Sequence, residues 1–196
     1  IDLAKKNGIN PFEIKMALDG LAIIVHPSNP VFKLTLDQLS QIFSGKIQNW
    51  KELGGKDAEI VILSREVNSG THVYFKEKVV RKNDSSSKEE FSPGALMLSS
   101  SQAIADEIAQ NTDGIGYYGM GYLSERQKAV LVAKDSQSPY IEPTLDNVVS
   151  GLYPISRDLY FYTNGTPSGS LKEFIEFCLS PEGDSITIDN DFVPLK

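Results

Sequence analysis

The segment from Ser64 to Thr71 carries the side chains best suited to bind a small oxyanion. Arg65 ends in a planar guanidinium, which can donate parallel hydrogen bonds to two oxygens of a tetrahedral anion. Ser69 and Thr71 add hydroxyl donors, and Gly70 has no side chain to hold a ligand away from the backbone. Arg65, Ser69, Gly70 and Thr71 therefore predict half of an oxyanion cradle.

The elements on either side of this segment would bring its donors to one point. Residues 60–63 have the apolar run of a short buried strand, and residues 71–80 have helical character. The amides of Gly70, Thr71 and His72 would then be first-turn donors that no helical carbonyl accepts, at the positive end of the helix dipole. The sequence predicts a strand, a polar turn and a helix whose start faces the anion.

Residue types alone also allow a plainer interpretation, in which Ser69 only caps the helix and Arg65 is a surface charge. The segment has no Gly-Lys-Ser/Thr pattern, so nucleotide binding is not indicated. Ser69 and His72 are close enough in sequence to suggest a nucleophile and a base. However, no nucleophile elbow surrounds Ser69, so a hydrolase is not favoured and no catalytic residue is predicted.

The other ionisable candidates give weaker signals. Asp19 could accept the proton of hydrogen phosphate, but Asp19-Gly20 is first a turn pattern. His26 and His72 are too far apart in sequence for a local metal pair, and the single cysteine, Cys178, completes no zinc pattern. We therefore predict no metal site and no cofactor, with both histidines in packing or surface roles.

Two further side-chain groups have both a packing role and a functional alternative. Cys178 falls at a helical repeat of apolar residues and is expected in the core rather than as a reactive thiol. For one set of four aromatic side chains, packing is the preferred interpretation and an aromatic sugar-binding platform is the alternative. That set is Trp50, Tyr117, Tyr118 and Tyr122.

The composition limits the class of protein. The chain has 196 residues, 40% hydrophobic and 23% charged, which favours a soluble globular protein over a disordered one. Its longest apolar run, residues 21–25, is far shorter than the roughly 20 residues that span a bilayer, and any export signal would lie upstream of Ile1. A net charge of −7 disfavours nucleic acid and anionic membranes, but not a small anion in a cleft.

The remaining pattern alternates strands and helices, which indicates an α/β fold. Residues 12–18 and 21–25 are predicted as two strand pieces, with a helix as the alternative for the first. Thr35 and Gln38 form a capping box before a helix that Gly45 can end. Further predictions are helices at 101–109 and 171–178, strands at 114–118, 128–133 and 159–163, and a mobile surface loop at 82–94.

Several separated motifs, in a consistent order, closely resemble the phosphate-binding proteins of phosphate ABC transporters. The resemblance extends over nearly the whole chain. Its motifs are DGLAIIVHPSNP at 19–30, LTLDQLSQIFSGKIQNWKELGG at 34–55, IVILSREVNSGT at 60–71 and DGIGYYG at 113–119.

The resemblance implies a type II periplasmic-binding-protein-like α/β fold with two lobes and a ligand cleft between them. Residues 28–152 would form the second lobe, which carries the anion site, and the lobes would be joined by crossings near 25–30 and 152–157. Residues 1–27 and 153–196 would form an incomplete first lobe. Family members have a phosphate-contacting turn before the position of Ile1, and roughly 60 to 80 residues would be lacking there. Either the chain is a fragment or a second chain completes the lobe.

The same resemblance implies a function. Arg65, Ser69, Gly70 and Thr71 would bind inorganic phosphate, and the protein would deliver it to the membrane permease of an ABC transporter from an extracytoplasmic location. No enzyme activity and no nucleic-acid partner are expected. Two alternatives remain open at this level: a sensory or adhesion module that uses the same cleft, and a binder of another oxyanion such as sulfate.

Overall fold

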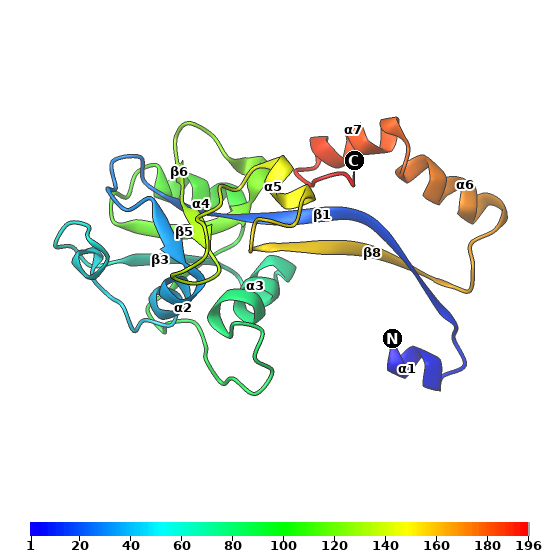
Figure 1. Cartoon of the computed structure of the whole chain (residues 1–196), viewed down its shortest axis with the longest axis horizontal. Helices are drawn as coiled ribbons and strands as arrows, with labels where there is room; N and C mark the ends of the chain where they lie inside the picture. The colour runs from blue at the N-terminus through cyan, green and yellow to red at the C-terminus, as the bar shows by residue number, and fades with distance from the viewer. Residues whose placement is uncertain (196) are drawn as a thin grey trace.

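The computed structural model describes residues 1–195 and shows a compact body with an arm extending from it (Figure 1). The arm consists of the first part of one long strand, the strand that pairs with it and two helices, and a short N-terminal helix lies near its far end (Figure 1). These elements are β1 (Pro11–Val25), β8 (Ser156–Asn164), α6 (Gly169–Cys178), α7 (Pro181–Asp189) and α1 (Asp2–Lys6).

The body contains a mixed sheet with the strand order β4-β3-β5-β1-β6. Strand β3 is parallel to β4 and β5, whereas β1 is antiparallel to β5 and β6. A second, parallel pair joins β2 to β7. The bounds are β2 (Lys33–Thr35), β3 (Val61–Arg65), β4 (Leu96–Leu98), β5 (Gly114–Gly119), β6 (Lys128–Ala129) and β7 (Leu131–Ala133).

Helices pack around these strands and close the body's core. The helices and short helical segments are α2 (Leu36–Phe43), η1 (Trp50–Leu53), α3 (Gly70–Phe75), η2 (Lys76–Val80), α4 (Ser101–Ile108), η3 (Met120–Tyr122) and α5 (Leu145–Val149). Aromatic rings dominate the core: Phe75 stacks on Tyr117 at 3.7 Å, and Phe43 meets Phe75 edge-on at 4.7 Å. The predicted α/β class is confirmed. No helix among residues 1–195 is long and apolar enough to cross a membrane.

Strand β1 connects the arm to the body. Its last five residues, Leu21–Val25, are completely buried and pair with β5, while residues 11–20 pair with β8. The prediction of two separate strand pieces, and the helical alternative for the first, are both wrong. The strand continues through Gly20, where a Cβ would meet the sulfur of Met120 at 2.8 Å, so the close packing there requires glycine. It also continues through buried Asp19, which has an ion-pair partner on β8.

Local start and stop signals behave as the sequence predicts. Thr35 accepts a hydrogen bond from the Gln38 amide at 3.1 Å, and the Gln38 side chain accepts one from the Thr35 amide at 2.9 Å. Gly45 has a left-handed φ of 78°, just beyond the C-cap of α2. The predicted strand–turn–helix at 60–80 forms as β3, α3 and η2.

Several expectations need correction. Residues 128–133 do not form one strand but split into β6 and β7, which belong to different sheets. Cys178 is only half-buried, because the arm has no closed core around α6. Trp50, Tyr117 and Tyr118 are fully buried, so the sugar-platform alternative fails, since a platform needs exposed rings.

The segment 82–94 has no helix or strand, as expected for a surface loop. Ion pairs connect it to the body, between Lys82 and Asp37 at 2.8 Å and between Lys46 and Glu89 at 2.8 Å. Because these groups are exposed, each pair contributes little stability.

Candidate anion-binding site

Strand β3 and helix α3 place the predicted cradle in the body. Arg65 is the last residue of β3, and α3 begins at Gly70 after a turn in which the Ser69 amide donates to the Glu66 carbonyl at 2.9 Å. Ser69 occupies the N-cap position, but its hydroxyl forms no capping hydrogen bond. Ser69 therefore occupies the N-cap position without the side-chain hydrogen bond that the plainer interpretation expects.

Arg65 is oriented by the segment that leads into α4. Its Nη2 donates to the Ser99 carbonyl at 3.0 Å, and its Nη1 donates to the Ser101 hydroxyl at 3.3 Å. Its Nε is buried and has no hydrogen-bond partner within residues 1–195. The two hydrogen bonds hold the guanidinium in one place, so Arg65 is a positioned group rather than a freely moving surface charge.

A polar cleft of 260 Å³ opens beside these groups. Arg65 and Thr71 line it, whereas Ser69 and Gly70, the other two predicted ligands, do not. The remaining lining residues come from β1, β8, the start of α4, the end of β5, η3 and the stretch after α7: Asp19, Arg157, Ser101, Gly119, Tyr122, Asn190, Asp191 and Phe192.

Most of these further residues could not be found by sequence reasoning. Asp19, which the sequence offers as a proton acceptor, lines the cleft and lies opposite Arg157 in the β1–β8 ladder. The Arg157 Nη2 lies 2.8 Å from the Asp19 Oδ2. Ser101 did have a local signal, since a serine at the start of a predicted helix offers a hydroxyl and a free amide.

A buried network under the site fixes the course of β3. The hydroxyl of Ser64 lies 2.7 Å from the Tyr117 hydroxyl and 3.1 Å from the His72 Nδ1, and His72 stacks on Phe91 at 4.5 Å. Burial lowers the pKa of His72, which favours its neutral form, and burial raises the pKa of Tyr117 to about 12. His72 is therefore a packing residue.

The same geometry separates His72 from the proposed nucleophile. Its Nδ1 bonds with Ser64, which is completely buried, and not with Ser69. Within residues 1–195, no three or more His, Cys, Asp or Glu side chains gather closely enough to hold a metal ion. The arrangement places the Arg65 guanidinium and the Thr71 side chain, two groups with the chemistry of anion ligands, at one cleft.

The fold and this site define a periplasmic-binding-protein-like α/β protein with a polar cleft. A family model described as a PBP superfamily domain matches residues 1–182. The chain belongs to this superfamily, and its relatives there are PstS-type phosphate-binding proteins. It is 32% identical to the phosphate-binding protein PstS of Pseudomonas aeruginosa over 97% of its length, and 33% identical to PstS of Bacillus subtilis over 92%.

Solved structures agree with this assignment. A Clostridium perfringens protein, described as a phosphate ABC transporter substrate-binding protein with bound phosphate, aligns with all of this chain at 36% identity and a TM-score of 0.78. An ABC-type phosphate transport receptor from Vibrio cholerae aligns with 93% of the chain at 29% identity and a TM-score of 0.79. The chain covers 76% and 72% of those two chains, but only 62% and 57% of the two curated relatives.

Proposed function

We propose that this chain captures inorganic phosphate as part of an extracytoplasmic solute-binding protein and presents it to the permease of an ABC transporter. The observation that carries the proposal is the position of Arg65 and Thr71, which line one polar cleft at the junction of β3 and α3. The relatives support it, because they carry the names of phosphate-binding proteins and phosphate transport receptors.

Each cradle residue would contribute a different interaction. Arg65 would supply charge and guanidinium donors from the side that lines the cleft. Thr71 and Ser69 would supply hydroxyl donors, and Ser69 would reach the anion after a rotation of its uncapped side chain. Gly70 leaves open space where a Cβ would stand, so the first amides of α3 remain accessible.

We also propose the division of the chain into lobes. Residues 28–152 would form the second lobe, and residues 1–27 and 153–196 would belong to a first lobe that further polypeptide completes. In support, β8 pairs only with β1 among residues 1–195, so its other edge is open. The far edge of β1 in the arm has one partner in the same part of the chain, an isolated bridge between Leu18 and Val193. Residues 21–25 nevertheless pair within the body sheet, so the two lobes would share β1.

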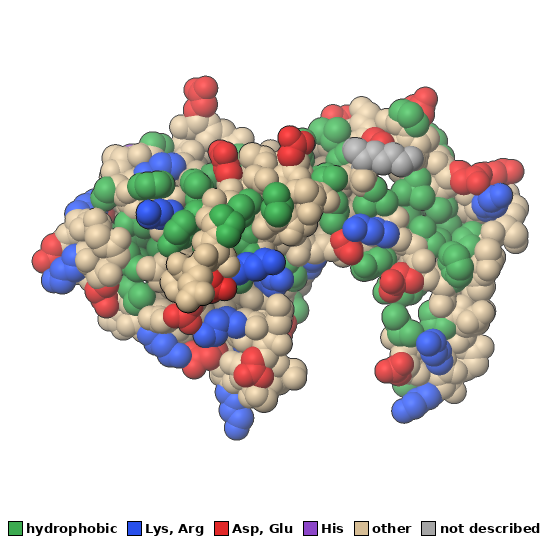
Figure 2. Space-filling model, viewed as in Figure 1, with side chains coloured by type: hydrophobic (Ala, Val, Ile, Leu, Met, Phe, Trp, Pro, Cys, Tyr) green, Lys and Arg blue, Asp and Glu red, His purple; other side chains and the backbone are tan. Residues whose placement is uncertain are grey.

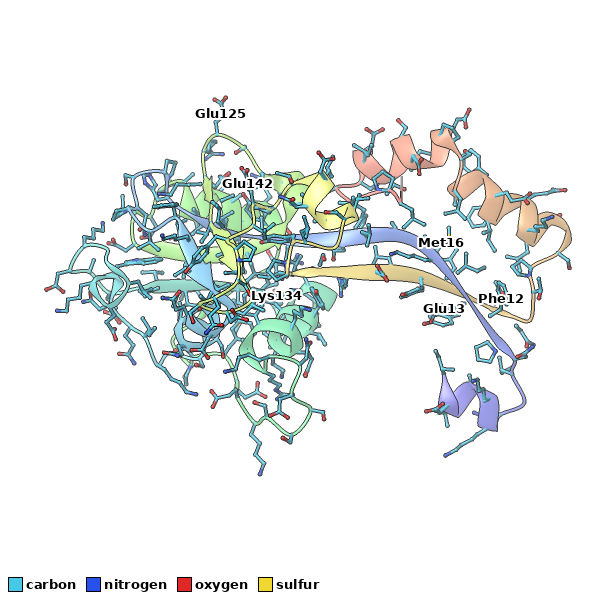
Figure 3. All side chains as sticks on the ribbon, in the orientation of Figure 1. Phe12, Glu13, Met16, Glu125, Lys134 and Glu142 are labelled. Atoms are coloured by element: carbon cyan, nitrogen blue, oxygen red, sulfur yellow. The ribbon has the colours of Figure 1, made fainter. Side chains whose placement is uncertain are left out.

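The apolar surface of the arm supports the proposal that further polypeptide completes the first lobe. Figure 2 shows hydrophobic side chains gathered over the arm, and Figure 3 shows Phe12, Glu13 and Met16 along its part of β1. An apolar groove of 180 Å³ lies between the ribbon and the two helices and includes Phe161 and Phe177. Phe161, Phe174 and Phe177 expose 42%, 54% and 49% of their surface. Such a surface is typical of one that another segment covers.

Binding without turnover is the proposed activity. The hydroxyl with a histidine partner, Ser64, is inaccessible, and the accessible Ser69 has no base bonded to it. A solute-binding protein needs only a closed, loaded shape that the permease can distinguish from the empty one. The cleft as described would also fit sulfate, so selectivity for phosphate needs its own measurement.

The test is calorimetric titration of the chain with phosphate, with sulfate as competitor, for the wild type and Arg65→Ala. Arg126→Ala is a matched control, since Arg126 is exposed, pairs with Asp106 and does not line the cleft. We expect selective phosphate binding that Arg65→Ala abolishes and Arg126→Ala preserves.

If the chain alone does not bind, the same titration is repeated on a version extended by the sequence its gene encodes upstream of Ile1. Recovery of binding would support the proposed incomplete lobe. Absence of binding in both forms would overturn the phosphate assignment, and retention of binding by Arg65→Ala would overturn the location of the site at Arg65.

A further inference from the structure

The base of the arm contains an ion pair that reaches the start of α3. Asp19 on β1 and Arg157 on β8 are cross-strand partners, and Asp19 is only 3% exposed. The Arg157 Nε and Nη2 approach the same carboxylate oxygen, Asp19 Oδ2, at 3.0 and 2.8 Å. A buried carboxylate needs such a partner, so Asp19 fixes the guanidinium in one place.

The third nitrogen of the same guanidinium extends to the anion-binding helix. The Arg157 Nη1 donates to the Gly70 carbonyl at 3.3 Å, which is the first carbonyl of α3. The guanidinium also lies over the ring of Tyr74, 4.8 Å from its centroid. The Tyr74 hydroxyl donates to the Ser156 carbonyl at 2.6 Å. Helix α3 is thus attached to β8 at its first residue and one turn further on.

The charge balance of the cleft separates the roles of its two arginines. Arg157 lines the cleft together with Arg65, but its charge is paired with the Asp19 carboxylate and its Nη1 donates to the Gly70 carbonyl. Arg65 has no carboxylate partner within residues 1–195 and retains an unpaired donor. An arriving anion would therefore meet the unneutralised charge of Arg65, while Arg157 is committed to the protein.

We propose that Arg157, held by Asp19, is a positioning residue of the anion site that sets the start of α3 relative to the β1–β8 pair. This inference rests on the proposed function, since it assumes that the amides of Gly70 and Thr71 face the anion. Lysine could not replace Arg157, because a point charge cannot contact Asp19, the Gly70 carbonyl and the Tyr74 ring at once.

The direction in which Asp19→Asn changes phosphate affinity distinguishes a positioning role from a purely electrostatic one. Asp19→Asn removes a negative charge from the cleft, so electrostatics alone would strengthen anion binding. Positioning predicts the opposite, because Arg157 would lose its anchor and the start of α3 would shift. Arg157→Ala should lower phosphate affinity by about tenfold or more, as for other residues that orient direct ligands. Arg157→Lys should show most of that loss.

The experiment is calorimetric titration with inorganic phosphate of the wild type, Arg157→Ala, Arg157→Lys and Asp19→Asn, at low and high salt. Asp158→Asn is the matched control: Asp158 pairs with Lys15 on the same ribbon, at 2.7 Å, and does not line the cleft. We expect losses for the first three variants that salt does not remove, no loss for the control, and no extra loss when Asp19→Asn is added to Arg157→Ala.

Amide NMR spectra of the free 196-residue chain provide a readout that needs no binding. The Gly70 and Thr71 resonances should shift in Arg157→Ala and Asp19→Asn while those of the aromatic core stay in place. Unmoved resonances, or tighter phosphate binding by Asp19→Asn, would overturn the positioning role. A wild type that binds no phosphate, alone or extended, would instead overturn the proposed function, and the amide shifts would then show only whether Arg157 holds the start of α3.

Discussion

Phenylalanines in the body and in the arm have very different surroundings. In the body, Phe43 and Phe75 are completely buried and pack edge-on, whereas in the arm Phe161 and Phe174 stack on each other and remain about half exposed. The body closes its core because sheet and helices meet on several sides. A two-stranded ribbon with helices on one side cannot do so.

In this molecule, regular secondary structure forms even where no closed core surrounds it. Strand β8 and helices α6 and α7 form with well-defined limits, supported by pairing to β1 and by local capping such as Ser180 accepting from the Gly183 amide. Many of their apolar side chains nevertheless remain exposed to solvent. We therefore expect most of the free energy of unfolding to come from the body, and substitutions there to cost more than substitutions in the arm.

The largest effect should follow Phe75→Ala in the body. Phe75 contacts Phe43, Phe91 and Tyr117, so truncation leaves a cavity and should cost about 3–5 kcal/mol in the free energy of unfolding. Urea denaturation measures it. A cost below about 1 kcal/mol would contradict the closed core, since that value is typical of a site that can collapse or is already wet.

Ser64→Ala should be next in size. The substitution leaves the Tyr117 hydroxyl and the His72 Nδ1 without their shared partner in a buried place, at a cost of about 1–3 kcal/mol. Adding Tyr117→Phe should cost less than the sum of the two single changes, because it removes one unpaired group. Fully additive losses in urea denaturation would show that the network is not coupled.

The free energy of unfolding should depend on pH through the protonation of His72. Burial lowers the pKa of His72 in the folded protein, so the unfolded chain binds a proton more readily. The stabilisation is therefore complete above the unfolded value of about 6.5 and is lost as pH falls through the lowered folded pKa. Unfolding measured between pH 8 and pH 5 should show a weaker dependence in His72→Gln than in the wild type. Identical profiles would contradict the assignment.

The smallest effect should follow Phe161→Ala in the arm. Because Phe161 is 42% exposed, its truncation in the isolated chain should cost less than about 1 kcal/mol. If further polypeptide covers the arm, the same substitution should cost more in the completed protein. An equal and small cost in both forms would contradict the proposal that further polypeptide covers the exposed side chains of the arm.

Much of the body could be predicted because its signals are local. The capping box at Thr35, the left-handed Gly45 and the apolar run before Arg65 each act within one or two turns of chain. The cradle residues belong to this group, since strand, turn and helix follow each other directly. The same local view failed at residues 12–25, where an Asp-Gly turn pattern is overridden by pairing with β8.

The sequence alone predicts the α/β class, the family and a candidate anion-binding segment from Arg65 to Thr71. Only the tertiary structure decided that β1 is continuous, that Asp19 meets Arg157 from 138 positions away, and that residues 190–192 reach the cleft. The reason is physical: capping and periodicity act between near neighbours. Strand register and ion pairing across the chain depend on which surfaces are brought together by burial.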